Sequence, residues 1–185
     1  YFFQNDSTKA RRALRDYIAG NPKGQYLVDA NYRLAFILYQ AAATGQSGGD
    51  VPLAREMLEK LAEDYPSDVN LGQVWSLLGD IYSRLQPTEQ DKTNYTEKAL
   101  KAYQAAVEKA KTPDVLDYAI DAATNILTGE GRWQEIATLW ERYYATHKNS
   151  PSALRAISEI AGASRRMGRP EEAQKLIAEH IAPNL

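Results

Sequence analysis

The side chains that could carry out catalysis in this chain are few, and their spacing does not suit it. His147 and His180 are the only histidines, and neither lies at a metal-ligand spacing from a second ligand. Glu171 and Glu172 fall where a helix is expected to begin, a position at which the helix dipole favours carboxylates. The sequence has no cysteine, so thiolate chemistry is excluded. We therefore predict no catalytic residue, no metal site and no cofactor, and we expect the protein not to be an enzyme.

Composition excludes two further classes of partner. The formal net charge of −2 provides no basic excess to neutralise the phosphates of a nucleic acid. No apolar run approaches the roughly 20 residues of a membrane-spanning helix. We expect neither nucleic-acid binding nor a membrane span within this chain, whereas an anchor upstream of it stays open. The expected partner is a protein or a peptide.

Apolar residues recur at helical spacing along the whole chain, and signals for β-strands are nearly absent. Proline and glycine fall between the apolar stripes, as they do between short helices. Longer polar loops are expected at residues 45–50 and 86–93. We predict nine helices. They cover residues 7–20, 26–43, 52–65, 69–85, 95–111, 114–128, 132–147, 151–167 and 170–182.

The predicted helices alternate between two kinds, which indicates a repeated helix pair. The clearest repeat carries Trp75, Leu78, Gly79 and Tyr82 on its first helix and Ala99, Tyr103, Ala106 and Pro113 on its second. This pattern resembles the tetratricopeptide repeat (TPR), a helix–turn–helix unit of about 34 residues. The resemblance implies an all-α fold, a right-handed solenoid of antiparallel helix pairs. We expect a single array over residues 1–185, made of a truncated repeat at 1–25 and pairs at 26–68, 69–113, 114–150 and 151–185.

A finer resemblance concerns the segment ALRDYIAGNPKGQYLVDANYRLAFILY at residues 13–39. Its spacing is similar to that of bacterial periplasmic repeat proteins of the BamD/YbgF-like type. AREMLEKLAEDYPSD, at residues 54–68, is of the same style. The resemblance implies a periplasmic location, or attachment to a membrane facing the periplasm, and a role in assembly of the bacterial envelope. The alternative is a cytoplasmic location.

Gly79 stands in the middle of an apolar helical stripe, where glycine costs roughly 1 kcal/mol relative to alanine. We infer that a partner helix crosses so closely that no side chain fits there. Ala35 and Ala161 are its expected counterparts in other repeats. Thr124 departs from the pattern, because a glycine or an alanine is usual at that position.

The first helices of such an array line its concave face, which is the expected binding surface. Tyr32, Phe36 and Tyr39 lie on one face of their helix, away from the small residues that contact the partner helix. Two uses remain open for this aromatic stripe: burial against the preceding repeat, or a floor for a bound peptide. Tyr32 and Phe36 stand where chaperone-binding repeats carry a Lys and an Asn, so that class of ligand is not expected.

On the first helices of the later repeats, the corresponding face carries mainly polar residues. The predicted partner-binding set is Tyr32, Phe36, Tyr39, Gln73, Asp80, Arg84, Tyr118, Asp121, Asn125, Arg155, Arg165 and Arg166, with Ser76, Ser83 and Ser158 beside them. We expect Arg155, Arg165 and Arg166 to hold an acidic segment of the partner, because the guanidinium fork binds carboxylates. The expected function is a non-catalytic scaffold for protein–protein interaction. The alternative is a structural module that associates with itself or with a neighbouring domain, so the oligomeric state stays open.

The aromatic residues Tyr1, Phe2 and Phe3 begin the sequence, and Tyr1 stands nine residues before the helical anchor Ala10, as Leu127 stands nine residues before Ile136. This register predicts that they end a first-type helix whose body lies upstream. The chain would then be a fragment of a longer repeat protein. The alternative is that the aromatic residues end a membrane anchor.

Overall fold

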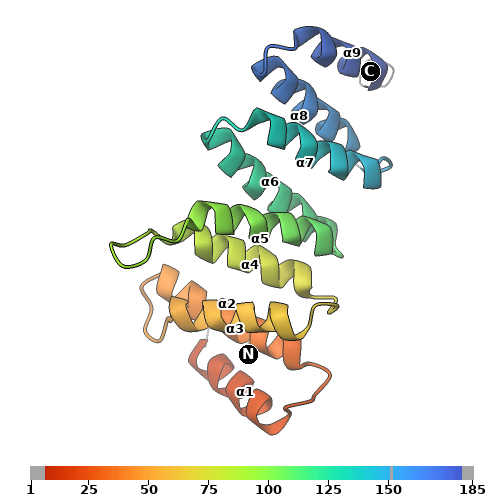
Figure 1. Cartoon of the computed structure of the whole chain (residues 1–185). Helices are drawn as coiled ribbons and strands as arrows, with labels where there is room; N and C mark the ends of the chain where they lie inside the picture. The colour runs from red at the N-terminus through yellow and green to blue at the C-terminus, as the bar shows by residue number, and fades with distance from the viewer. Residues whose placement is uncertain (1–6, 151, 181–185) are drawn as a thin grey trace. The chain divides into compact units, whose positions relative to one another are not determined.

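A computed structural model of the chain describes residues 7–150 and 152–180, and in this part it shows α-helices and no strand (Figure 1). The helices follow one another as short, similar elements joined by turns and two longer loops. Their bounds are α1 Ser7–Gly20, α2 Leu27–Ala43, α3 Val51–Asp64, α4 Leu71–Arg84, α5 Tyr95–Lys109, α6 Pro113–Gly129, α7 Trp133–Thr146, α8 Ala153–Arg166 and α9 Pro170–His180.

The predicted all-α helical-repeat fold is confirmed, since every predicted helix has its counterpart within two residues over the described part of the chain. At the start of α4 the difference is two residues, because the helix begins at Leu71 instead of residue 69. There the Asp68 carboxylate accepts a hydrogen bond from the Asn70 backbone N–H at 2.8 Å, so the segment forms a turn before the helix. The interpretation of Tyr1–Phe3 as a helix end lies outside the described residues.

The chain divides into two compact units, one up to Ile120 and the other from Asp121 onward. In the first unit, α1 packs on α2, α2 on α3, α3 on α4 and α4 on α5. In the second unit, α7 packs on α8 and α8 on α9. Nearest-neighbour packing of this kind is the basis of helical-repeat proteins, in which each repeat contacts its neighbours.

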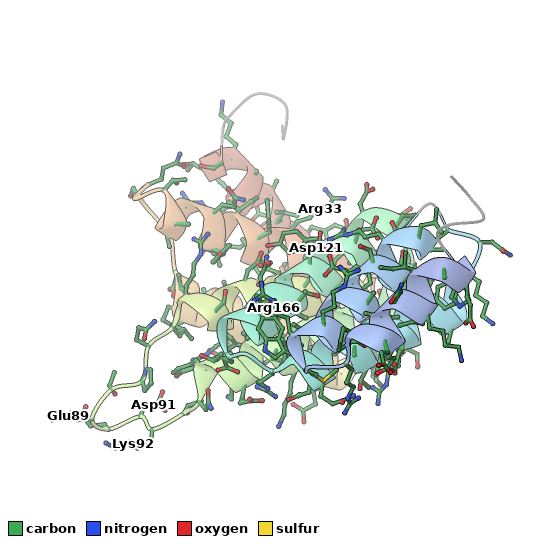
Figure 2. The ribbon with its side chains drawn as sticks, turned by 90° about the horizontal axis from the view of Figure 1, so that it is seen from above. Arg33, Glu89, Asp91, Lys92, Asp121 and Arg166 are labelled. Atoms are coloured by element: carbon green, nitrogen blue, oxygen red, sulfur yellow. The ribbon has the colours of Figure 1, made fainter. Side chains whose placement is uncertain are left out.

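Caps and glycine turns explain where several helices begin and end. Asp50 and Asn94 cap α3 and α5, accepting hydrogen bonds from the Leu53 and Glu97 backbone N–H groups at 2.9 and 3.1 Å. Gly131 follows α6 with a φ of 68°, in the left-handed region that glycine adopts most readily. The longer loop before α5 extends away from the helices, and Figure 2 shows Glu89, Asp91 and Lys92 on it.

The close helix crossing predicted at Gly79 is confirmed. A Cβ built on Gly79 would lie 2.5 Å from Cε1 of Tyr103, so the tyrosine ring of α5 fills the space that a side chain would need. Ala35 and Ala161, the expected counterparts, are both buried. The glycine therefore makes room for an aromatic side chain between α4 and α5.

Thr124 has a structural explanation in the second unit. The indole N–H of Trp140 on α7 donates a hydrogen bond to its hydroxyl oxygen at 3.0 Å. The Trp140 side chain is fully buried, and a buried indole N–H needs an acceptor. A threonine supplies that acceptor, which neither glycine nor alanine could do.

Candidate partner-binding groove

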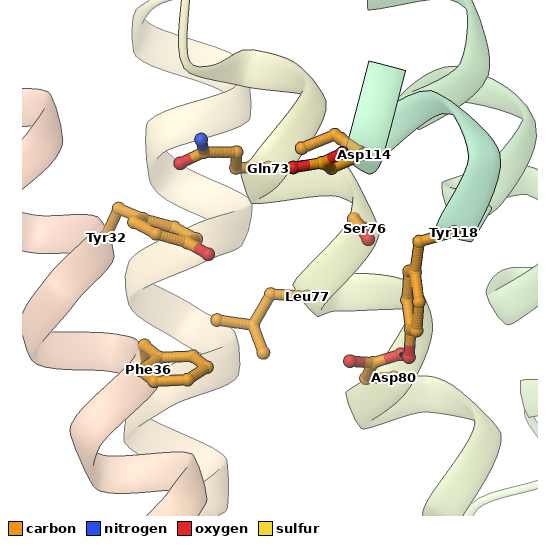
Figure 3. A pocket seen from close by; sticks show the side chains of 9 residues that line it. Tyr32, Phe36, Gln73, Ser76, Leu77, Asp80, Asp114 and Tyr118 are labelled. Carbon is orange, nitrogen blue, oxygen red and sulfur yellow. Dashed lines mark hydrogen bonds between the residues drawn. The ribbon is translucent and has the colours of Figure 1, made fainter. Parts of the chain in front are cut away.

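A hollow of about 210 Å³ lies in the first unit, between α2, α4 and the start of α6 (Figure 3). We call it the groove. Successive first helices supply its walls, because their residues at spacings of three and four lie on one face. The side chains that line it are Tyr32, Phe36, Gln73, Ser76, Leu77, Asp80, Asp114, Val115 and Tyr118.

The wall formed by α2 is aromatic. Tyr32 and Phe36 lie one helical turn apart with their rings roughly parallel, 6.4 Å between centroids and 26° between planes. Figure 3 shows both rings directed toward Leu77 of α4. Phe36 is 38% exposed although it is a large apolar side chain, and it therefore offers apolar surface to a ligand.

The opposite side of the groove is acidic and rich in hydroxyl groups. The Asp80 carboxylate accepts a hydrogen bond from the Tyr103 hydroxyl at 2.7 Å and one from the Tyr118 hydroxyl at 2.6 Å, both on Oδ1. Tyr103 comes from α5 and Tyr118 from α6, so the Asp80 carboxylate joins three helices of the unit. Asp114 adds a second carboxylate in the first turn of α6.

The electrostatic effect of Asp80 extends to the tyrosines around it. Burial raises the pKa of Tyr103 and Tyr118, and the hydrogen bond to Asp80 raises each pKa further. Burial is also the main cause of the raised pKa of Tyr32, with the Asp80 charge as the next cause. These phenols stay neutral at physiological pH, so they do not alter the negative charge that Asp80 brings to the groove.

A second hollow, of about 160 Å³, continues the groove along α4 and α6. The two hollows share Gln73 and Val115, which makes them neighbours. Val69 lines the second hollow and is 67% exposed, and Lys111 provides a cation at this end. The two hollows together form a path across the face that the first helices present.

The structure brings together five of the predicted binding residues in the groove: Tyr32, Phe36, Gln73, Asp80 and Tyr118. Ser76, which the projection also placed on this face, lines it as well. Tyr39, by contrast, is 6% exposed and does not line either hollow. The guanidinium of Arg84 lies over its ring at 5.1 Å. Within the aromatic stripe, Tyr32 and Phe36 therefore line the groove, whereas Tyr39 is buried beside Arg84 of α4.

The remaining predicted binding residues lie in the second unit and are not part of the groove. Asp121 forms an ion pair with Arg155 of α8, and the Arg155 guanidinium also lies 5.1 Å from the centre of the Trp140 ring. The Arg166 guanidinium lies over the Trp133 ring at 5.5 Å. Asn125 and Arg165 are exposed on the surface of this unit.

The expected arginine cluster is only partly present. Arg155 and Arg165 are ten positions apart on α8, which corresponds to roughly 15 Å along the axis at about 1.5 Å per residue. Because Arg155 is held by Asp121 and Trp140, its guanidinium has a structural role within the unit. The three arginines therefore do not form one compact site, and their binding of an acidic segment stays a prediction without support from this geometry.

Sequence reasoning missed Leu77, Asp114 and Val115 as lining residues. Leu77 and Val115 were given no role from the sequence, and Asp114 is the first residue of the helix predicted at 114–128. A signal for them existed, because Leu77 lies one position from Ser76, and Asp114 and Val115 lie three or four positions before Tyr118. Selecting the residues that neighbour each predicted binding position on the same helix face would have included them.

Residues 7–150 and 152–180 contain neither a metal-binding cluster nor a membrane-spanning helix. This part of the chain holds no group of three or more histidine, aspartate or glutamate side chains placed to bind a metal ion. Within the same residues, no helix has the length and apolar character needed to cross a bilayer.

Comparisons with known proteins agree with the helical-repeat architecture. No curated protein matches the chain significantly. The crystal structure of MamA protein is similar, with a TM-score of 0.56 and 19% identity over 97% of this chain and 83% of that one. A further crystal structure of MamA matches with a TM-score of 0.56 and 18% identity, over 97% of this chain and 89% of that one. The model of the TPR-S family, Tetratricopeptide Repeats-Sensor, matches residues 6–127, and the chain therefore belongs to this family.

Proposed function

We propose that this protein is a non-catalytic scaffold that binds an extended segment of a partner protein in the groove. Tetratricopeptide-repeat proteins are in general protein-interaction scaffolds, which supports the broader part of the proposal. The observation that carries the finer part is the groove itself. Its aromatic wall and its acidic side come from three successive first helices and stay accessible, with Phe36 38% and Tyr118 51% exposed.

The size of the groove favours side chains of a peptide over a drug-sized molecule. Pockets for such molecules usually measure about 300–1,000 Å³, whereas the groove measures about 210 Å³. One or two side chains fit this volume. The neighbouring hollow of about 160 Å³ extends the path, as an extended chain requires. Self-association is the alternative use, and a stable dimer would need about 800 Å² of surface from each partner.

We propose further that the protein acts in the bacterial cell envelope, on the periplasmic side. The support is the resemblance of residues 13–39 to periplasmic repeat proteins. Cell fractionation of the native host, followed by immunoblotting, tests this location. Recovery of the protein with the cytoplasmic fraction would contradict it.

The scaffold function is tested with a display library of random twelve-residue peptides, selected on the full chain. Recovered peptides are then measured against Phe36→Ala and against Leu53→Ala as the matched control. Leu53 is 36% exposed in the same unit, close to the value for Phe36, but it does not line the groove.

We expect the peptides to bind the wild type and Leu53→Ala equally and Phe36→Ala at least tenfold more weakly, because the variant loses the exposed face of the aromatic wall. Light scattering on the same samples should show a monomer at all concentrations. Failure to recover any peptide that depends on Phe36, together with a concentration-dependent oligomer, would favour self-association instead.

A further inference from the structure

The groove combines aromatic rings with carboxylates, and this combination specifies the ligand more closely than the fold does. Building on the proposed function, we propose that the bound peptide places an arginine side chain in the groove. Its guanidinium lies between the α2 rings, Tyr32 and Phe36, and the carboxylates Asp80 and Asp114. Apolar neighbours of the arginine in the peptide contact Leu77 and Val115.

The charge of the groove is the first argument. Asp80 and Asp114 both line it, and no lysine, arginine or histidine is among its lining residues. Over residues 7–150 and 152–180, neither carboxylate forms an ion pair with a cation of the chain. Both hydroxyl groups that bind Asp80 share its Oδ1 atom, and this leaves Oδ2 to accept from a ligand. A cationic group is thus the complementary occupant.

The aromatic wall is the second argument, and it favours arginine over lysine. A guanidinium is planar and weakly hydrated, so it stacks on aromatic rings while its N–H groups donate to carboxylates. An ammonium is strongly hydrated and lacks the planar stacking face. Tyr32 and Phe36 present nearly parallel rings on one side of the groove, and Asp80 lies on the other (Figure 3).

The chain itself builds the same arrangement inside its second unit. There Arg155 of α8 pairs with the Asp121 carboxylate of α6, and its guanidinium lies over the Trp140 ring at 5.1 Å. Helix α8 therefore places an arginine against a carboxylate of α6 and an aromatic ring of α7. In the groove, Figure 3 shows Leu77 of the next first helix facing Tyr32 and Phe36, and no lining residue carries a positive charge. A ligand can supply the missing cation.

The test uses peptides recovered by the display selection that lose affinity on Phe36→Ala. The arginine of each peptide is replaced by citrulline, which has nearly the same shape and no charge, and separately by lysine. Affinities are measured by calorimetry on the wild type, Asp80→Asn and Asp114→Asn. Asp80→Asn retains an oxygen that can accept from Tyr103 and Tyr118. Asp114 is exposed, so at least one of the two variants keeps the fold.

We expect the citrulline peptide to bind the wild type roughly ten- to a hundredfold more weakly, the range for loss of a charge-assisted hydrogen bond. The difference between the two peptides should shrink on Asp80→Asn or Asp114→Asn, because the charge partner is gone. Binding of the arginine peptide should also weaken with added salt. The citrulline replacement removes the charge of the contact from the peptide, and the aspartate variants remove it from the protein.

The outcomes separate this inference from the proposed function. One contrary result is that recovered peptides depend on Phe36 but carry no cation, and another is that they bind equally well with citrulline in place of arginine. Either result would contradict the inference that an arginine occupies the groove and would leave the scaffold function unaffected. A lysine peptide as tight as the arginine peptide would contradict the stacking on Tyr32 and Phe36. If no recovered peptide depended on Phe36, the scaffold function in the groove would itself be wrong.

Discussion

The Tyr103 ring occupies the position that a side chain of residue 79 would need, since a Cβ on Gly79 would come within 2.5 Å of it. The ring is held there by its own hydroxyl, which donates to Asp80, the residue next to Gly79. The helix pair α4–α5 and the acidic side of the groove therefore depend on the same tyrosine. Packing and binding surface are coupled at this point.

Gly79→Ala should lower the free energy of unfolding by about 1–3 kcal/mol, because the added methyl group overpacks the crossing against the Tyr103 ring. The control is Gly162→Ala in the middle of α8, where an added Cβ meets nothing within 4 Å. That change should stabilise its helix by about 0.5–1 kcal/mol. Urea denaturation followed by circular dichroism measures both. An unchanged or raised stability for Gly79→Ala would contradict the crossing.

Trp140→Phe should lower the free energy of unfolding by about 2–4 kcal/mol, because it leaves a void in a fully buried site and removes the indole hydrogen bond to Thr124. Thr124→Ala should cost less, about 1 kcal/mol. The double variant should be less destabilised than the sum of the two single variants, since both remove the same hydrogen bond. Strict additivity in this cycle would show that the indole–hydroxyl pair contributes nothing.

Arg155→Ala should lower the free energy of unfolding by about 0.5–1 kcal/mol, a small value because the side chains of Arg155 and Asp121 are 44% and 41% exposed and water screens them. Arg165→Ala is the matched control on the same helix, since Arg165 forms no ion pair with any described residue. It should leave stability unchanged. Thermal denaturation at low and high salt compares them. Equal effects of the two substitutions would contradict the structural role of Arg155.

Alkaline pH should destabilise the first unit through its tyrosines. The pKa values of Tyr82, Tyr103 and Tyr118 are raised above the ordinary value of 10.0, mainly by burial and then by hydrogen bonds to Glu59 or Asp80. A raised pKa in the folded state contributes stability that is fully present below pH 10 and is lost as the pH rises beyond it.

Absorbance of tyrosinate at 295 nm measures this titration. A fraction of the tyrosines should ionise only well above pH 10 in the wild type, and Asp80→Asn should shift part of that fraction downward by removing the carboxylate charge beside Tyr103 and Tyr118. A single transition near pH 10 for all tyrosines would refute the expectation.

The sequence by itself determined the helices and the all-α repeat fold. Apolar periodicity marks a helix wherever one face must be buried, and glycine and proline mark its ends. A glycine amid apolar residues at Gly79 predicts a close neighbour, because only a packed partner offsets the cost of glycine in a helix. These signals are local, and for this reason they can be read without the tertiary structure.

Only the tertiary structure decided what the exposed face does. Tyr32, Phe36 and Tyr39 recur at the same helical spacing, yet Tyr39 is buried whereas Phe36 lines the groove. Asp80 and Arg155 look alike in the sequence as charged residues on first helices. The fold places Asp80 under two tyrosine hydroxyls in the groove and Arg155 against Asp121 and Trp140. Each outcome depends on which side chains neighbouring helices bring within contact distance, and residues distant in the sequence set those contacts.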